Sequence, residues 1–222
     1  MSEDTTPEVF IIESLHEEDF DSNRVGKVIE QVLIMGAMKP IYRYVKTYQE
    51  LQMAMQEFHH SNYRYLHLSF HGDEESFETH FGVLPFNQLL PSLNGIVRGK
   101  RVFISSCEVV THVNHELANI LIRNAGCVSL VGSYEEIAFN DAALMWSTFY
   151  YLCFRDQKDR IKIRREDITG NLKTLTRLFR LNLNYYALSQ SQGITLTQFK
   201  SGKVWHEDKY QAEPDPLAGE LI

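Results

Sequence analysis

Short apolar runs alternate with amphipathic stretches along most of this chain. The apolar runs are rich in valine, isoleucine, leucine and aromatic residues, and they cover residues 9–12, 41–45, 63–70, 101–106 and 127–131. Runs of this length and composition predict strands. Nearly continuous runs such as RVFI and VSLV are typical of strands that are buried on both faces. The pattern therefore predicts a sheet that is covered on both sides.

The stretches between these runs predict helices, because their apolar residues recur at helical spacing. They cover residues 23–35, 47–58, 86–96, 114–124, 142–154 and 167–188. Thr47, with Glu50 three residues later, matches a helix-capping pattern. Residues 77–84 and 194–206 predict hairpins, the second around Ser201-Gly202. Alternating strands and helices predict an α/β fold, a three-layer sandwich with a mostly parallel sheet.

The composition indicates a globular domain with a substantial core. The chain has 222 residues, of which 44% are hydrophobic and 23% charged, a profile that fits an ordinary folded protein. We expect one domain over residues 1–206. The tail, residues 207–222, is acidic and contains proline, so we expect it to be disordered.

Charge and cysteine usage narrow the class of protein further. A net charge of −7 argues against a general nucleic-acid-binding surface. No apolar run is long enough to span a bilayer, and the polar N-terminus does not resemble a signal peptide. The chain has 3 cysteines, an odd number without framework spacing, which indicates free thiols in a reducing compartment. We therefore expect a cytoplasmic protein.

Two residues that can carry chemistry stand at the ends of predicted strands. His71 and Gly72 follow the run at 63–70, and Cys107 follows the run at 101–106. Ligands of open α/β sheets bind outside the carboxyl ends of the strands. If these two strands are neighbours, His71 and Cys107 face one crevice, where an imidazole can accept the proton of a nucleophilic thiol. The backbone amides of Gly72 and Cys107 could bind the oxyanion of an acyl-transfer intermediate.

Three segments give the sequence a resemblance to a known family. LHLSFHG, RVFISSCEV and GCVSLVGSYEEIAFNDAALMWSTFYYL resemble the caspase-like cysteine peptidases of clan CD, and within them the bacterial CHAT domains related to separase. The resemblance implies a caspase-like fold and a catalytic dyad of His71 and Cys107. It implies an oxyanion hole of the Gly72 and Cys107 amides and a protein substrate, without metal or organic cofactor. It also implies a regulated signalling or antiviral defence setting.

The sequence departs from animal caspases at the cysteine. Their Gln-Ala-Cys-x-Gly signature is absent, and Ser106-Cys107-Glu108 stands in its place. The resemblance therefore does not imply cleavage after aspartate. A catalytically inactive caspase-like interaction module is the first alternative. An α/β protein that binds a nucleotide or a phospho-ligand is the second, although no glycine-rich phosphate loop follows any predicted strand.

The loop after the run at 127–131 contains the acidic residues that we expect to determine which residue precedes the cleaved bond. It holds Glu135, Glu136 and Asp141, and the resemblance implies that this loop lines the substrate pocket, with Glu136 as the first candidate. A carboxylate pairs well with a guanidinium, so we expect cleavage after arginine or lysine. The segment 158–165, KDRIKIRR, would then be a candidate self-cleavage site.

An unregulated intracellular peptidase is hazardous, so we also expect a regulatory partner protein that acts in trans.

Overall fold

The computed structural model describes residues 5–111, 115–155, 162–189 and 193–207. The expected tail lies almost wholly outside these ranges, as do residues 158–161 of the candidate self-cleavage segment 158–165. Among the described residues, no helix combines the length and the apolar character that crossing a membrane requires.

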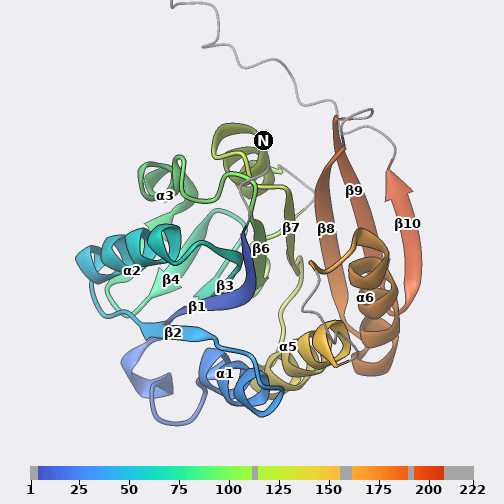
Figure 1. Ribbon diagram of the computed structural model, residues 1–222, viewed down its shortest axis with the longest axis horizontal. Helices are drawn as coiled ribbons and strands as arrows, with labels where there is room; N and C mark the ends of the chain where they lie inside the picture. The colour runs from blue at the N-terminus through green and yellow to red at the C-terminus, as the bar shows by residue number, and fades with distance from the viewer. Residues whose placement is uncertain (1–4, 112–114, 156–161, 190–192, 208–222) are drawn as a thin grey trace, which may run out of the picture.

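A central sheet runs through the molecule in the order β10-β9-β8-β7-β6-β3-β1-β2 (Figure 1). The parallel strands are β1 (Thr6–Ser14), β2 (Ile41–Tyr44), β3 (Tyr63–Gly72), β6 (Arg101–Ser105) and β7 (Ser129–Ser133). The antiparallel strands are β8 (Asn182–Ser189), β9 (Gly193–Lys200) and β10 (Lys203–Glu207). The expected α/β fold with a mostly parallel sheet is confirmed.

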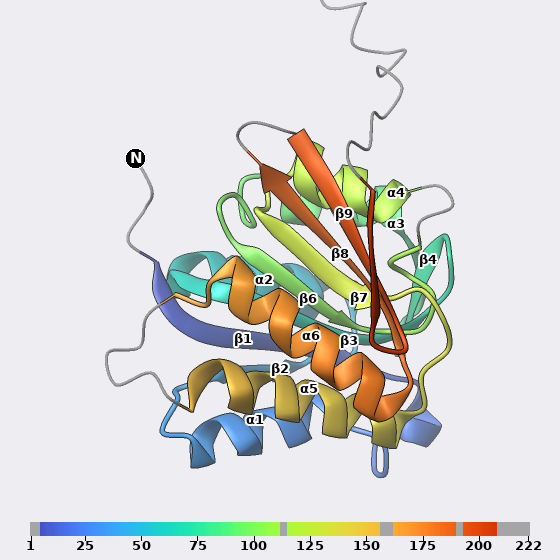
Figure 2. The same cartoon turned by 90° about the vertical axis from the view of Figure 1, so that its right-hand side faces the viewer.

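Helices cover both faces of this sheet, so the molecule has three layers (Figure 2). One layer is formed by α1 (Val25–Met35), α5 (Phe139–Phe154) and α6 (Arg165–Phe179). The other is formed by α2 (Tyr48–Ser61), α3 (Phe86–Leu93), α4 (Glu116–Ala118) and the π-helical turn η2 (Asn119–Asn124). A separate apolar core fills each side, as expected for strands that bury both faces.

The side chains of β3 show how the strands divide between the two cores. Tyr65 packs in the core under α1 and α5, whereas Leu66 and Leu68 pack in the core under α2 and α3. The alternation follows from the two-residue period of a strand. It places His67, Ser69 and His71 on the face toward α1 and α5.

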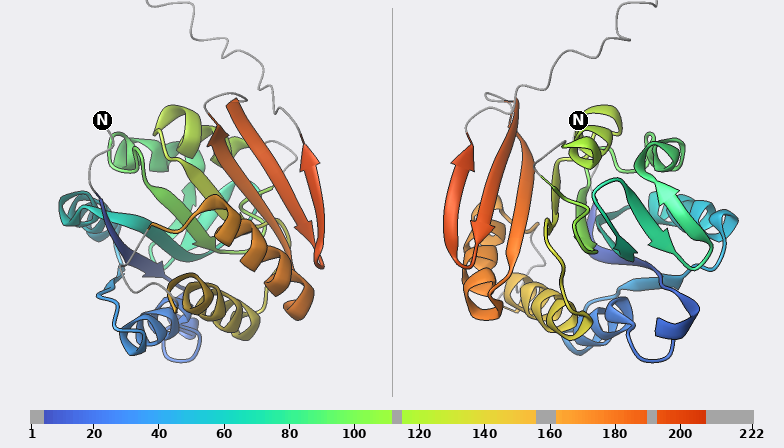
Figure 3. Two further views of the ribbon diagram at one scale, coloured as in Figure 1. Left: turned by 45° about the vertical axis from the view of Figure 1, so that its right-hand side comes forward. Right: turned by 180° about the vertical axis from the view of Figure 1, so that it is seen from behind.

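The predicted hairpins are also present. The first consists of β4 (Ser76–Thr79) and β5 (Gly82–Pro85), and β4 pairs with the end of β3. In the second, β9 and β10 pair across Ser201-Gly202, and both turn residues have positive φ, as a tight hairpin turn requires. Figure 3 shows β8, β9 and β10 extending the sheet beyond β7.

The helix predicted over residues 167–188 is wrong in its second half. α6 ends at Phe179, Arg180 takes a left-handed conformation, and β8 then pairs antiparallel with β7. Leucine spacing suggested one long helix, but Leu178 is 68% exposed. From Leu181 the apolar residues that face the α5 side alternate strictly, which is the period of a strand. They are Leu181, Leu183, Tyr185 and Ala187.

The start of α1 is held by a buried glutamate at the carboxyl end of β1. Glu13 is fully buried and accepts the backbone N–H of Gly26 at 2.6 Å, the hydroxyl of Ser69 at 2.9 Å and the hydroxyl of Tyr42 at 2.6 Å. Burial raises the pKa of Glu13, and the three hydrogen bonds oppose that rise. Glu13 thereby fixes α1 against the strand ends where His71 lies.

Candidate active site

The structure places His71 and Cys107 in one pocket at the carboxyl edge of the parallel strands. β3 and β6 are neighbours, and Ser69 pairs with Ser105. His71 and Cys107 each lie two positions beyond that pair, so their side chains share one face of the sheet. Both line a pocket of about 50 Å³ beneath the start of α5. Its walls on the helix side are Val25, Ile137, Phe139 and Ala142.

His71 is held by side chains from two other segments of the chain. Its Nε2 atom lies 2.9 Å from Oδ2 of Asp19. Its ring stacks on His16 with centroids 4.6 Å apart, and Phe139 meets it edge to face at 5.1 Å. An ionised carboxylate only accepts hydrogen bonds, so Nε2 carries the proton of the neutral ring. Nδ1, which has no hydrogen-bond partner among the described residues, is then the atom that can accept a proton.

Asp19 is fixed on both of its carboxylate oxygens. Oδ1 accepts a hydrogen bond of 2.7 Å from the side-chain amide of Asn23, and Oδ2 accepts the bond from His71. Partial burial alone would raise the pKa of Asp19, but the bonds from Asn23 and His71 and the charges of His71 and His16 lower it overall. Asp19 therefore stays ionised at neutral pH and orients the imidazole.

Cys107 is held by the loop that follows β7. Its Sγ accepts the backbone N–H of Ile137 at 3.4 Å, and the thiol lies 3.7 Å from the carbonyl oxygen of the same residue. Burial raises the pKa of Cys107, the charges of Glu136 and Glu108 raise it further, and the N–H of Ile137 lowers it. In this arrangement the thiol is protonated at neutral pH, and it needs a base to become a nucleophile.

Gly72 lies directly against the segment that carries the cysteine. A Cβ at this position would lie 2.5 Å from Cγ1 of Val109, 2.7 Å from Oγ of Ser106 and 2.9 Å from the carbonyl oxygen of Ser76. Only glycine allows the end of β3 to approach so closely. This packing gives Gly72 a structural role of its own, and its amide as an oxyanion donor stays a prediction.

The residue after the cysteine has an unusual backbone conformation. Glu108 has φ of 55°, a left-handed conformation that costs a non-glycine residue roughly 1–2 kcal/mol. Two backbone hydrogen bonds hold it, from Glu108 to the carbonyl of Glu135 at 3.3 Å and from Val110 to the carbonyl of Ser133 at 3.0 Å. The cysteine segment and the loop 134–138 therefore form one connected unit.

The acidic residues expected to bind substrate lie in or beside this unit, and none of them lines the pocket of His71 and Cys107. Glu135 and Glu136 are exposed in the loop, and Asp141 lies in the first turn of α5. Glu136 is near enough for its charge to act on the thiol of Cys107. Their role in substrate binding stays a prediction.

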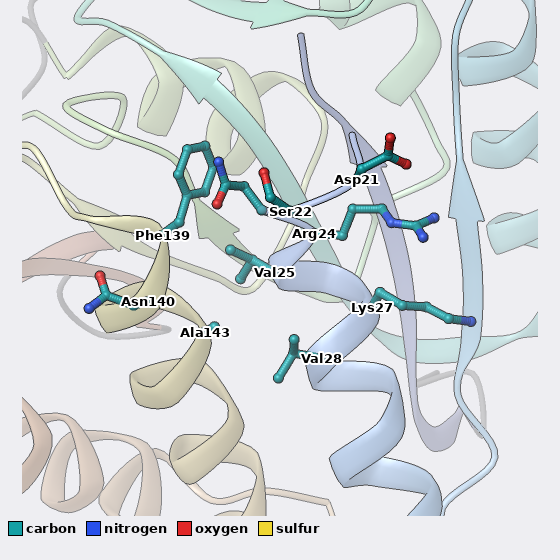
Figure 4. Close-up of a pocket in the computed structure, with 10 residues that line it drawn as sticks. Asp21, Ser22, Arg24, Val25, Lys27, Val28, Phe139, Asn140 and Ala143 are labelled. Carbon is teal, nitrogen blue, oxygen red and sulfur yellow. The ribbon is translucent and has the colours of Figure 1, made fainter. Parts of the chain in front are cut away.

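A larger pocket of about 340 Å³ adjoins the first and shares Val25 and Phe139 with it. Figure 4 shows it between the first turns of α1 and α5. Val28 and Ala143 lie on its apolar side, while the charged end of Arg24 extends away from α5. The two pockets together give the His71 edge of the sheet a partly apolar surface that can accept a side chain of a bound chain.

Sequence reasoning missed His16 and Asp19. Both lie in or beside the short helix η1 (Glu17–Asp19) that follows β1. In the sequence they are part of an acidic stretch, LHEEDFDSN, that has the composition of an ordinary polar connection. No spacing signal links this stretch to the end of β3.

The strand order and the three layers are those of a caspase-like α/β fold. Among solved structures, the chain is similar to the crystal structure of the Arg specific cysteine proteinase gingipain R. The match has a TM-score of 0.55 and 12% sequence identity, and it covers 93% of this chain and 69% of that chain. No family model matches the sequence, and no curated protein matches it. The likeness therefore establishes the fold.

Proposed function

We propose that this chain is a cysteine endopeptidase in which Cys107 is the nucleophile and His71 its base. One observation carries the proposal: both side chains line a single pocket at adjacent strand ends, with the imidazole oriented by Asp19. A thiol, an imidazole and an orienting carboxylate are the groups that acyl transfer requires.

The reaction follows from the proton positions at these groups. Nδ1 of His71 takes the proton of the Cys107 thiol, and the thiolate attacks the peptide carbonyl. The amides of Gly72 and Cys107 bind the resulting oxyanion. The imidazolium then protonates the leaving amine, and His71 deprotonates the water that hydrolyses the thioester. Asp19 acts as a positioning residue, because its bond to Nε2 keeps Nδ1 free to accept a proton.

Substituting the two reacting residues tests this function. Cys107→Ala and His71→Ala should each lower the hydrolysis of fluorogenic peptides by several orders of magnitude, because the two residues act as a unit. Cys127→Ala is the matched control, since this cysteine is fully buried in the core under α3 and η2. Hydrolysis that survives in the folded Cys107→Ala variant would refute the assignment.

We propose cleavage after arginine or lysine, with Glu136 as the first candidate for the carboxylate that binds the basic side chain and Asp141 as the second. The acidic loop beside Cys107 supports this, and the structural relative is described as Arg specific. Peptides that differ only in arginine, aspartate or leucine before the cleaved bond should show the preference. Glu136→Gln or Asp141→Asn should weaken it, and an arginine preference that neither substitution changes would show that the acid is misassigned.

We propose that the isolated chain hydrolyses small peptides slowly but is latent toward protein substrates, and that a partner protein activates it in trans. The surroundings of Cys107 support latency, because burial and the charges of Glu136 and Glu108 raise the pKa of the thiol and keep it protonated. A partner that moves the loop 134–138 would release the thiol. Rapid turnover of an unfolded protein by the pure chain alone would contradict this.

The same raised pKa of Cys107 favours the second candidate, a catalytically inactive caspase-like interaction module. A peptidyl acyloxymethyl ketone separates the two candidates, since a peptidase is labelled at Cys107 and an inactive module is not. We also propose that the chain is a CHAT-type relative of separase, that it acts in the cytoplasm and that it serves signalling or antiviral defence.

A further inference from the structure

A cluster of metal-binding side chains surrounds the imidazole of His71. His16 follows β1, Asp19 ends the short helix η1, and His71 lies near the carboxyl end of β3. One ligand atom from each of them lies within 4.8 Å of the other two. Three segments therefore converge on one point.

The donor set of this cluster suits zinc. Two imidazoles and one carboxylate are the three-ligand pattern of open zinc sites, in which a further ligand or water completes a tetrahedron. Glu78 lies opposite His71 in the β3–β4 pairing, and its Oε2 is 3.7 Å from Nε2 of His16. Glu78 thus borders the cluster without belonging to the group of mutually close ligand atoms, and water can fill the fourth position. Calcium and magnesium prefer sites made of oxygen alone.

The carboxylate of the cluster is already oriented as metal ligands usually are. Asn23 binds Oδ1 of Asp19 at 2.7 Å, which leaves Oδ2 directed at Nε2 of His71. Carboxylates that bind metals are typically fixed in this way by a hydrogen bond to the other oxygen. Asn23 thus provides the support that a bound ion needs.

A small movement closes the site. Zinc bonds of about 2.0–2.2 Å in a tetrahedron place ligand atoms about 3.4 Å apart, so a spacing of 4.8 Å, the upper limit here, must shrink by about 1.4 Å. The side chain of His16 is 40% exposed, and it can rotate out of its stack on His71 without disturbing the core. The bond between His71 and Asp19 opens slightly as the ion enters.

We propose that His16, Asp19 and His71 bind one Zn²⁺ ion and that this ion switches off the base of the peptidase. The second half rests on the proposed function of His71. Zinc takes the lone pair of Nε2, so the one proton of the neutral ring moves to Nδ1. Nδ1 can then no longer accept the proton of Cys107. The resemblance implies no metal, and this proposal departs from that expectation because the ligands come from segments that no sequence pattern links.

Zinc titration of the Cys107→Ala variant of the whole chain tests the site, since this substitution removes the thiol as a competing ligand. Isothermal titration calorimetry should show one Zn²⁺ per chain and no comparable binding of Ca²⁺. In the same background, His16→Ala and Asp19→Asn should each weaken the affinity by about tenfold or more. His59→Ala, which removes an exposed histidine at the end of α2, should leave it unchanged. Thermal unfolding in EDTA checks that every variant is folded.

Co²⁺ in place of Zn²⁺ should give the intense visible absorption of a tetrahedral site, and His16→Ala should lose it. If adding His16→Ala or Asp19→Asn to the Cys107→Ala variant leaves the zinc affinity unchanged, the proposed site is overturned.

Hydrolysis by the wild-type peptidase tests the switch. The rate of hydrolysis with zinc, divided by the rate without zinc, should fall at the same zinc concentrations that fill the site. Full hydrolysis at saturating zinc would overturn the switch. Zinc binding without any hydrolysis in metal-free buffer would instead count against the proposed function.

Discussion

At the scale of single residues, the reactivity of Cys107 depends on the charges around it. Cys107 is partly exposed, whereas Cys127 and Cys153 are buried. Burial raises the pKa of all three thiols, that of Cys153 to about 12. A soluble alkylating reagent therefore reports on Cys107 in the folded protein, because the thiolate is the reacting form and the other two thiols are inaccessible.

Removing the charge of Glu136 should make Cys107 more reactive. The negative charge of this glutamate raises the pKa of the thiol, so Glu136→Gln lowers the pKa and shifts the pH profile of alkylation to lower pH. Because the charge of Glu136 is partly screened, its removal should raise the rate of alkylation of Cys107 by iodoacetamide at pH 7.5 by about two- to threefold. Glu135→Gln is the matched control, since this neighbouring exposed residue is not among the charges that raise the Cys107 pKa. Equal acceleration in both variants would contradict the assignment.

At the scale of elements, β3 connects the candidate site to both cores. Its carboxyl end carries His71 and then Gly72, which packs against Ser106 and Val109. Its middle carries His67, which is fully buried under Trp146 and Tyr150 of α5. Substitutions along this one strand therefore act on stability by different physical routes.

Gly72→Ala should destabilise the protein by about 1–3 kcal/mol, the usual cost of overpacking. The new methyl group would press on the cysteine segment and on the backbone of Ser76. Gly170→Ala is the control, because a Cβ there, on the exposed side of α6, meets no atom within 4 Å. Alanine in a helix interior should stabilise by about 0.5–1 kcal/mol relative to glycine. Urea unfolding measures both, and a neutral Gly72→Ala variant would show that the close packing yields easily.

His67 should make the folded state sensitive to mild acid. Burial lowers its pKa to about 3, while an unfolded histidine has a pKa of about 6.5. Between these values the unfolded chain binds the extra proton, so the free energy of unfolding falls as the pH falls below 6.5. The loss from pH 7 to pH 5 should be about 2 kcal/mol.

His67→Gln should remove this part of the pH dependence, and urea unfolding at pH 7 and pH 5 measures it. His59→Gln, at an exposed histidine, should leave the pH dependence as it is in the wild type. If the two variants have the same acid sensitivity, the buried histidine is not its source.

The sequence predicts helices and strands best where the apolar residues follow one clear period, either that of a helix or that of a strand. It predicts the candidate site best where the site residues lie at strand ends. His71 and Cys107 could be paired from the sequence, because a parallel sheet brings the carboxyl ends of neighbouring strands to one edge. The boundary between α6 and β8 was missed, because leucines at 172, 175 and 183 fit a helix until Arg180 reverses the chain. Asp19 was missed because its contact with His71 depends on how the connection after β1 folds back, which no local pattern encodes.

At the scale of the whole molecule, the sheet has two parts with different roles. The parallel part carries the site, with Glu13 and the helices α1 and α5 fixing the surroundings of His71 and Cys107. The antiparallel part extends the sheet beyond β7 and packs against α6. Loss of the outer strand β10 should therefore affect the candidate site less than a change in α1 or α5.

The two parts should also fold at different speeds. β8, β9 and β10 follow one another along the chain, so their pairing closes short loops. The hairpin of β4 and β5 and the helix α3 separate β3 from β6 along the chain, so the pairing of β3 with β6 closes a longer loop. Long-range pairing of this kind is slow, because the entropy of closing a long loop must be lost before contacts compensate for it. In pulse-labelling hydrogen exchange during refolding, we expect amides of β9 to be protected before those of β1 and β3, and the reverse order would contradict this. A refolding chain would then hold a formed C-terminal meander before its nucleophile and base have met.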